Sequence, residues 1–461
     1  MLLVKRNEMD MTTGPLMKKL VAYAVPVVIT GILQLLFNAA DVIIVGRYAG
    51  RTALAAVGST TSLINLIVNL FMMTSIGVNV AVARYYGAHE PMEVSKTVTT
   101  AMTMSVIIGL FVGIFGIVAS RPMLVLMESP ADVLDQAALY LRIYFMGIPA
   151  FMVYNFGAAV LRAVGDTQRP MKFLTIAGII NVILNLITVV GFKMGVAGVA
   201  IATAVSQYVS AAFIVMSLVT TESCLHLEVK ELRIYKDKLV EILRIGLPAG
   251  LQSLLFSITN VMIQASVNTF GSTIMAGSSA ASNIDGFIYT AMNAVTQTAM
   301  AFTGQNMGAR KYERIGRILG RCILLVTLVG GIMGVLCSLF RNGLINIYAN
   351  GDPEVIYWGA QRMLIVALPY FIFGISDTIV GVVRGMGNST LPMIISIFGV
   401  CAFRVLWLYT AFAAEPTFAM LMLGYPVSWA VTMLGQGLCY LLMKKKIIAR
   451  YEAKFAVWAY E

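Results

Sequence analysis

The chain has 461 residues, of which 59% are hydrophobic and only 12% are charged, and its mean hydropathy is +0.84. A soluble domain carries about 25% charged residues, so this composition excludes a water-soluble globular protein. The formal net charge of +11 would suit a nucleic-acid partner, but the placement of the basic residues argues against one.

The apolar residues come in runs of about 20, the helix length needed to cross a hydrocarbon core of about 30 Å. The sequence therefore predicts an all-α membrane protein with twelve transmembrane helices. In chain order we expect them at residues 21–46, 54–80, 98–120, 137–161, 172–192, 196–219, 245–268, 275–302, 319–340, 358–383, 391–412 and 417–443.

Most of the 33 lysines and arginines lie in segments on one side of these helices, together with both chain ends. Cytoplasmic segments of membrane proteins are enriched in Lys and Arg, so the charge indicates topology. We expect a multi-pass protein of the cell inner (plasma) membrane, embedded in its lipid bilayer, with both termini cytoplasmic. The first 20 residues show no cleavable signal.

The two halves of the sequence resemble each other at an offset of about 221 residues. Pro26 matches Pro248, and LRAVGDTQRP at Leu161–Pro170 matches VRGMGNSTLP at Val383–Pro392. Six helices per half is an even number, so the halves have the same orientation. Parallel repeats of this kind are related by a pseudo-twofold axis along the membrane normal, and their substrate usually lies between them.

This repeat predicts five segments. We expect a cytoplasmic N-terminal segment at 1–20, a six-helix lobe at 21–219, a cytoplasmic linker at 220–244, a second six-helix lobe at 245–443 and a basic cytoplasmic tail at 444–461.

Catalytic signatures are absent from the sequence, which contains no HExxH, GxSxG or P-loop motif. The five cysteines are scattered without CxxC spacing, and His89 and His226 lie in predicted loops without ligand spacing. We therefore expect no enzyme activity, no cofactor and no structural metal. A duplicated chain of this kind is typical of a secondary transporter, although some channels are duplicated too.

Polar side chains inside apolar helices of the first half form three faces, each with members about one turn apart. They are Gln34, Asn38 and Asp41 on the first helix, Asn181 and Asn185 on the fifth, and Thr203 and Gln207 on the sixth. Any single pair could simply hold two helices together. Three faces, one with a carboxylate, indicate a hydrated pocket. Carboxylate, amide and hydroxyl oxygens suit Na⁺, and the Asp41 carboxylate could instead carry H⁺.

The second half contains its own polar candidates for a substrate cavity. They are Asn260 and Gln264 on the seventh helix, Asp285 and Tyr289 on the eighth, and Asp377 on the tenth, which aligns with Asn155 of the fourth. Acidic groups in an otherwise apolar cavity favour cationic, amphipathic substrates.

These residues lie in a sequence that resembles the multidrug and toxic compound extrusion (MATE) family. The specific pieces are NAADVIIVGRYAG at Asn38–Gly50, LAAVG at Leu54–Gly58, the Gly-Ala loops after the second and eighth helices, and the two LRxxGD-like segments. The resemblance implies a V-shaped pair of six-helix bundles. It also implies alternating access and export of small-molecule organic cations, driven by Na⁺ or H⁺. We expect a monomer.

In DinF-like members of that family, a cation site is formed by positions that correspond here to Asp41, Asn181, Asn185 and Thr203. Some members bend the first helix near the proline equivalent to Pro26. This chain departs from the archaeal DinF-like pattern, because Asn185 replaces a second Asp. It also lacks the NorM-like Glu on the seventh helix, although Asp377 matches the NorM-like Asp on the tenth.

Two other functions stay open at this point. A flippase for a lipid-linked saccharide or other lipid belongs to the same superfamily. Its cavity should be rich in Arg and Lys, whereas Arg404 is the only basic residue deep in a predicted helix. A channel or receptor is a different class, and the sequence shows no filter-like segment.

Overall fold

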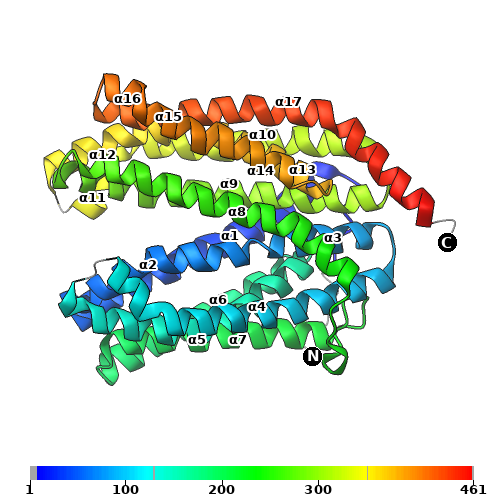
Figure 1. Ribbon diagram of the computed structural model, residues 1–461, viewed down its shortest axis with the longest axis horizontal. Coiled ribbons are helices and arrows are strands. Elements are labelled where there is room, and N and C mark those ends of the chain that lie inside the picture. The colour runs from blue at the N-terminus through cyan, green and yellow to red at the C-terminus, as the bar shows by residue number, and fades with distance from the viewer. Residues whose placement is uncertain (1–7, 128–129, 350, 459–461) are drawn as a thin grey trace. The chain divides into compact units, whose positions relative to one another are not determined.

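The computed structural model describes residues 8–127, 130–349 and 351–458, and within them the protein consists of helices joined by short loops (Figure 1). The expected all-α architecture is confirmed.

The first half contains the six expected helices, some of them in two pieces. They are α1 (Leu16–Ile44) with the π-helical turn η1 (Val45–Ala49), α2 (Arg51–Met72) with α3 (Ser75–Gly87), α4 (Pro91–Leu126), α5 (Ala131–Ala163), α6 (Gln168–Asn185) with η2 (Leu186–Gly191), and α7 (Gly195–Val219). A short 3₁₀ turn, η3 (Val229–Glu231), follows in the linker.

The second half again contains six helices, with more interruptions. They are α8 (Lys236–Asn268), α9 (Ser272–Gly308), α10 (Tyr312–Leu339) followed by the short α11 (Arg341–Ala349), α12 (Pro353–Val366) with α13 (Tyr370–Gly385), α14 (Thr390–Ser396) with η4 (Ile397–Ala402), α15 (Phe403–Tyr409) and α16 (Ala411–Ala414), and α17 (Phe418–Trp458). The helix α8 begins inside the expected linker, and α17 extends into the expected tail.

Ten of the described helical segments are long and apolar enough to cross a membrane, and α12 with α13 forms an eleventh span with a 45° bend. The twelfth, α9, has 37 residues but is more polar than the others because it includes Asp285, Asn293 and Gln297. The twelve-helix prediction is therefore confirmed, with the most polar helix in the second half.

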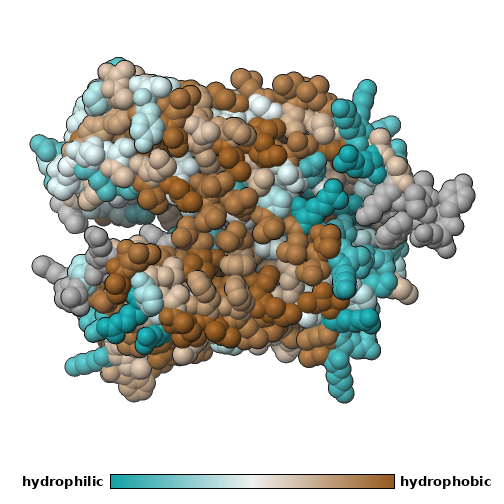
Figure 2. Space-filling view, in the orientation of Figure 1, coloured by the Kyte–Doolittle hydropathy of each residue, from teal (hydrophilic) through white to brown (hydrophobic). Residues whose placement is uncertain are grey.

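The apolar surface of the helices is largely exposed, as expected of a protein that faces lipid. On α4, Phe111, Ile114 and Val118 are more than half exposed. Figure 2 shows apolar residues over the middle of the helices in each half of the chain and hydrophilic residues toward the ends of the helices. The opposite face of α4 packs tightly, because a Cβ at Gly109 would lie 2.6 Å from Cα of Pro149 on α5.

The internal repeat is visible in the backbone. Gly50 and Gly271 have φ values of 89° and 97°, His89 and Arg310 have 58° and 56°, and Gly165 and Gly387 have 91° and 90°. Each pair is separated by 221 or 222 positions, the offset of the sequence repeat. Positive φ is uncommon for residues other than glycine, so its recurrence at matched loops shows that both halves use the same turns.

Contacts divide the described residues into two compact units. Unit 1 comprises Ile29–Gly250 with the described residues before Met11, and unit 2 comprises Met11–Val28 with the described residues from Leu251 onward. The division crosses α1 two residues after Pro26 and α8 two residues after Pro248. The lobes expected at 21–219 and 245–443 differ from this, because they assign each of these helices whole to one lobe.

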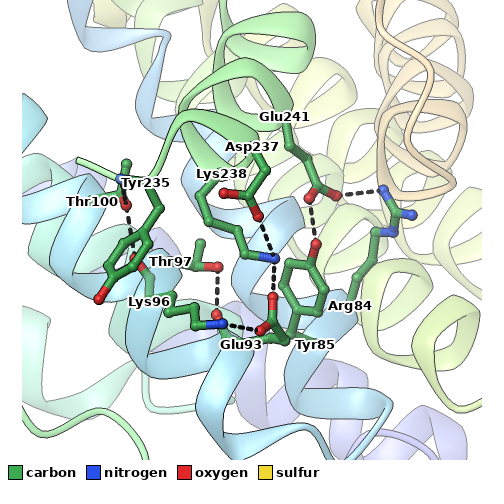
Figure 3. Close-up of polar contacts among 10 residues, drawn as sticks. All are labelled: Arg84, Tyr85, Glu93, Lys96, Thr97, Thr100, Tyr235, Asp237, Lys238 and Glu241. Carbon is green, nitrogen blue, oxygen red and sulfur yellow. Dashed lines mark hydrogen bonds and ion pairs between the residues drawn. The ribbon is translucent and has the colours of Figure 1, made fainter. Parts of the chain in front are cut away.

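The first turns of α8 are fixed within unit 1 by a charged network (Figure 3). Lys238 is 1% exposed, forms an ion pair with Glu93 of α4 and lies 3.9 Å from the ring centroid of Tyr85 on α3. Glu241 accepts a hydrogen bond of 2.7 Å from the Tyr85 hydroxyl and pairs with Arg84 at 3.0 Å. These contacts attach the first turns of α8 to unit 1.

Candidate functional site

Four polar side chains of three helices meet in unit 1. Asp41 comes from the last turn of α1, Asn181 and Asn185 from the last turns of α6, and Thr203 from the first half of α7. Asn181 and Asn185 are one helical turn apart, so both point from α6 toward the same neighbours. The four residues are the cluster that the sequence and the family resemblance singled out.

The four side chains form a closed ring of hydrogen bonds. Nδ2 of Asn185 donates to Oδ1 of Asp41 at 2.6 Å and to Oδ1 of Asn181 at 3.2 Å. Nδ2 of Asn181 approaches Oγ1 of Thr203 at 3.5 Å, and that hydroxyl donates to Oδ2 of Asp41 at 3.3 Å. Both carboxylate oxygens of Asp41 are therefore oriented by neutral donors.

The electrostatics of this cluster favour a cation. Asn185 is fully buried and Asn181 is 4% exposed. Within the described residues no lysine or arginine interacts with Asp41, and Oδ1 of Asn185 accepts no hydrogen bond. A buried carbonyl oxygen without a donor beside an unpaired carboxylate is an arrangement that a hard cation would complete.

The remaining candidates of the first half lie outside this ring. Gln34 and Asn38 are exposed on α1. Oε1 of Gln207 on α7 lies 2.3 Å from the position that a Cβ at Gly147 of α5 would take, so Gln207 packs against this glycine. Asn155 donates at 2.8 Å to the carbonyl of Phe151 in its own helix. Their assignment to a substrate cavity stays a prediction.

Two tyrosines of α5 were missed by the sequence reasoning. Tyr140 and Tyr144 stack with ring centroids 6.0 Å apart, and both interact electrostatically with Asp41. Their spacing of four on a predicted helix could have identified them as one face. That spacing gives no indication that the face lies beside Asp41.

Asp285 in unit 2 forms an ion pair. Its Oδ2 lies 3.3 Å from Nη2 of Arg362 on α12, and Arg362 also donates to the backbone carbonyl of Ser278 on α9. Asp285 and Arg362 are each 6% exposed. The pair joins α9 to α12 and gives Asp285 a structural partner that the sequence did not predict.

Asp377 of α13 is less tightly enclosed than Asp285. It lines a cavity of about 10 Å³, about the size of one water molecule, together with Gln252 and Trp429. Arg384 interacts electrostatically with Asp377 and donates at 2.9 Å to Oε1 of Gln252. Asp377 is thus an acidic group of unit 2 that borders a small cavity with both polar and apolar lining residues.

The other candidates of the second half lie on α8 and α9. Asn260 and Gln264 are exposed on α8, and Gln264 donates to Oδ1 of Asn268 at 3.0 Å. Tyr289 of α9 lies against Phe373, with ring centroids 6.0 Å apart. As for the first half, their role in a substrate cavity stays a prediction.

The MatE family model matches the chain twice, over residues 26–187 and 248–410, one match in each half of the repeat. The chain belongs to the MatE family. The resemblance read from the motifs is thereby confirmed, and MatE proteins are membrane transporters rather than enzymes.

Relatives and solved structures are similar over nearly the whole chain. The probable multidrug resistance protein YoeA of Bacillus subtilis is 26% identical, over 93% of this chain and 94% of that protein. A protein of Shewanella oneidensis named FAD transporter is 22% identical, over 95% and 97%. The outward-facing structure of a multidrug resistance MATE family transporter of the MOP superfamily has a TM-score of 0.88 at 21% identity, covering 98% and 99%. This MatE protein therefore has the two-lobe, twelve-helix fold.

Proposed function

We propose that this chain is a secondary active multidrug exporter that antiports organic cations or amphipathic toxic compounds against H⁺ or Na⁺ by alternating access. Its family and its relatives named as multidrug resistance proteins support multidrug efflux. The observation that carries the coupling proposal is the ring of hydrogen bonds in which the Asp41 carboxylate has only neutral partners, Asn185 and Thr203.

In this proposal Asp41 binds the coupling cation. Asn185 and Thr203 hold its two oxygens in place, so the carboxylate is oriented before the cation arrives. The carbonyl oxygen of Asn185 would become a second ligand of Na⁺, whereas H⁺ would bind the carboxylate alone. A membrane potential of 100 mV supplies about 2.3 kcal/mol for each charge that crosses.

Occupancy of the site is coupled to transport through α1. Asp41 lies in the part of α1 that belongs to unit 1, whereas Pro26 lies in the part that belongs to unit 2. A proline lacks the backbone N–H that completes the helical ladder, so helices bend there more easily. Binding of a cation neutralises Asp41 in the part of α1 that belongs to unit 1, while the part before Pro26 stays in unit 2. In this proposal, the change of charge alters the bend of α1 at Pro26.

We infer that the protein resides in the inner (plasma) membrane with both termini cytoplasmic and acts as a monomer. The lysines and arginines gathered around residues 220–244, 310–321 and 444–450 support this orientation. The flippase alternative is disfavoured, because a cavity for diphosphates needs several basic groups without acidic partners, whereas Arg404 is the one buried arginine among the described residues of unit 2 without a carboxylate partner.

A cargo with a negative group is a second candidate. The Shewanella relative is named for FAD, a phosphate-bearing molecule, and unit 2 contains a buried arginine without an acidic partner, Arg404. This observation favours zwitterionic or anionic compounds among the exported molecules.

Gradient-driven efflux from proteoliposomes tests the proposed antiport. The purified full-length chain is reconstituted, the vesicles are loaded with ethidium, and a Na⁺ or an H⁺ gradient is imposed separately while K⁺ and valinomycin hold the potential constant. We expect one of the two gradients to accelerate ethidium movement relative to liposomes without protein. Movement that is equally fast with either gradient and with none would rule out antiport.

A further inference from the structure

Arg404 lies in the middle of a membrane-spanning segment. It belongs to α15, within the span Thr390–Ala414, and only 5% of it is exposed. A guanidinium stays charged in a protein, and placing an unpaired charge at the bilayer centre is unfavourable by several kcal/mol. Such a residue is therefore expected to have a function.

The buried charges of unit 2 do not balance. Among its described residues, three arginines are less than a tenth exposed: Arg362, Arg384 and Arg404. Arg362 is paired with Asp285, and Arg384 interacts with Asp377. These are the two carboxylates that lie well inside the spans of this unit, so Arg404 is left as an excess positive charge.

The surroundings of Arg404 are polar but neutral. Its Nε donates to Oγ of Ser428 at 3.0 Å, its Nη1 donates to Oδ1 of Asn260 at 3.2 Å, and its Cζ lies 4.2 Å from the ring centroid of Tyr425. The titratable groups that interact with it are Tyr425, Cys401 and Tyr370, none of them a carboxylate. Within the described residues its Nη2 makes no hydrogen bond.

A polar path connects Arg404 to the surface of α8. Asn260, Gln264 and Asn268 are exposed and spaced four apart, so they form one stripe along the helix. A row of exposed amides inside a membrane span faces water rather than lipid, because unsatisfied amides are unfavourable in hydrocarbon. Asn260 belongs both to this stripe and to the contacts of Arg404, so a solute that reaches the stripe reaches the guanidinium.

We propose that Arg404, Asn260 and Tyr425 form a binding site for an anionic group, a carboxylate or a phosphate, of the transported molecule. The planar guanidinium can direct two parallel N–H groups at two oxygens of such a group, and the Asn260 amide can add a third donor. Tyr425 holds the guanidinium plane from one side through its ring. The site rests on the proposed function only in assuming that the bound molecule is cargo.

Riboflavin and its 5′-phosphate, FMN, are a suitable pair of probes, because they share one fluorescent ring system and differ by a phosphate. Their equilibrium binding to the purified full-length chain is measured by flavin fluorescence. The protein is held in nanodiscs of zwitterionic phosphatidylcholine, so that no anionic lipid competes. We expect the wild-type chain to bind FMN more tightly than riboflavin.

The substitution Arg404→Gln should weaken FMN binding by about 10- to 100-fold, the range for hydrogen bonds to charged groups, and leave riboflavin binding nearly unchanged. Arg404→Lys keeps the charge but loses the planar fork, so its affinity for FMN should be intermediate. Arg317→Gln removes an exposed positive charge elsewhere in unit 2 and should leave the preference for FMN intact.

Equal affinity of the wild-type chain for the two flavins would overturn the proposal, as would an equal loss of both in Arg404→Gln. If Arg404→Gln fails to fold, Asn260→Leu keeps the arginine and should still reduce the preference for FMN. Binding is measured without any ion gradient. A negative result in the binding measurement would therefore not contradict the proposed antiport, and a negative result in gradient-driven efflux would not contradict the anion site.

Discussion

Asn185 donates a hydrogen bond of 2.6 Å from Nδ2 to Oδ1 of Asp41, which links the last turn of α6 to the last turn of α1. An amide at position 185 can donate this bond, whereas an ionised carboxylate could not. The cluster therefore holds one negative charge rather than two. A single buried charge with neutral partners matches the binding of one monovalent cation.

Thr203 should contribute to transport through its hydroxyl group. Its Oγ1 donates to Oδ2 of Asp41, so Thr203→Val keeps the shape of the side chain but removes one bond that orients the carboxylate. Losing one hydrogen bond of about 1–1.5 kcal/mol should slow gradient-driven efflux about five- to ten-fold. Thr175→Val is the matched control, because the Thr175 hydroxyl donates only to Met171 of its own helix. Equal effects of the two substitutions would contradict a special role for Thr203.

Pro26 should be needed for transport and not for folding. Pro26→Ala restores a backbone N–H in the middle of α1, which makes the helix harder to bend. We expect efflux to fall several-fold while the thermal unfolding midpoint stays the same or rises. Pro91→Ala serves as the control, since Pro91 stands at the first position of α4, where its N–H is not required. Unchanged efflux in Pro26→Ala would argue against a bend at this point.

The two acids of unit 2 should respond differently to neutralisation. Asp285→Asn leaves Arg362 buried without its carboxylate, which should reduce the free energy of unfolding by about 3–5 kcal/mol. Asp377 interacts with Arg384 without a direct ion pair, and Arg384 keeps its hydrogen bond to Gln252 in Asp377→Asn, so this substitution should reduce efflux more than stability. Thermal unfolding and efflux are measured for both variants. A more severe loss of stability in Asp377→Asn than in Asp285→Asn would reverse these assignments.

Glu93 should stabilise the attachment of α8 to unit 1. Glu93→Gln removes the more buried of the two carboxylates that pair with Lys238, the other being the mostly exposed Asp237, and we expect a loss of roughly 3 kcal/mol, seen as a lower unfolding midpoint. Lys96→Met removes the second, partly exposed partner of Glu93, where an ion pair contributes only about 0–1 kcal/mol. A larger effect of Lys96→Met would show that the buried pair contributes little.

The twelve helices could be predicted because a membrane span must be long and apolar, and such runs are visible in the sequence. The division of α1 after Pro26 and of α8 after Pro248 could not be predicted. It depends on which neighbours each half of a helix contacts, and hydropathy contains no information on neighbours. Proline marked both positions, but proline also occurs in helices that stay within one unit, such as Pro149 in α5.

The residues of the candidate cation site were predicted in part. Spacing placed Asn181 and Asn185 on one face, and the family resemblance indicated that this face meets Asp41. The proximity of Tyr140 and the pairing of Asp285 with Arg362 were not predicted, because they arise from packing between helices distant in sequence. Periodicity assigns residues to a face of a helix and does not say which helix that face touches.

The most direct test of the central claim compares ion-driven efflux of ethidium between wild-type protein and Asp41→Asn in proteoliposomes at equal protein content. Asparagine has almost the same shape as aspartate but cannot exchange a cation or a proton. We predict that the imposed gradient no longer accelerates efflux in Asp41→Asn, while the variant unfolds at a similar temperature. Efflux that still responds fully to the gradient would contradict Asp41 as the coupling site.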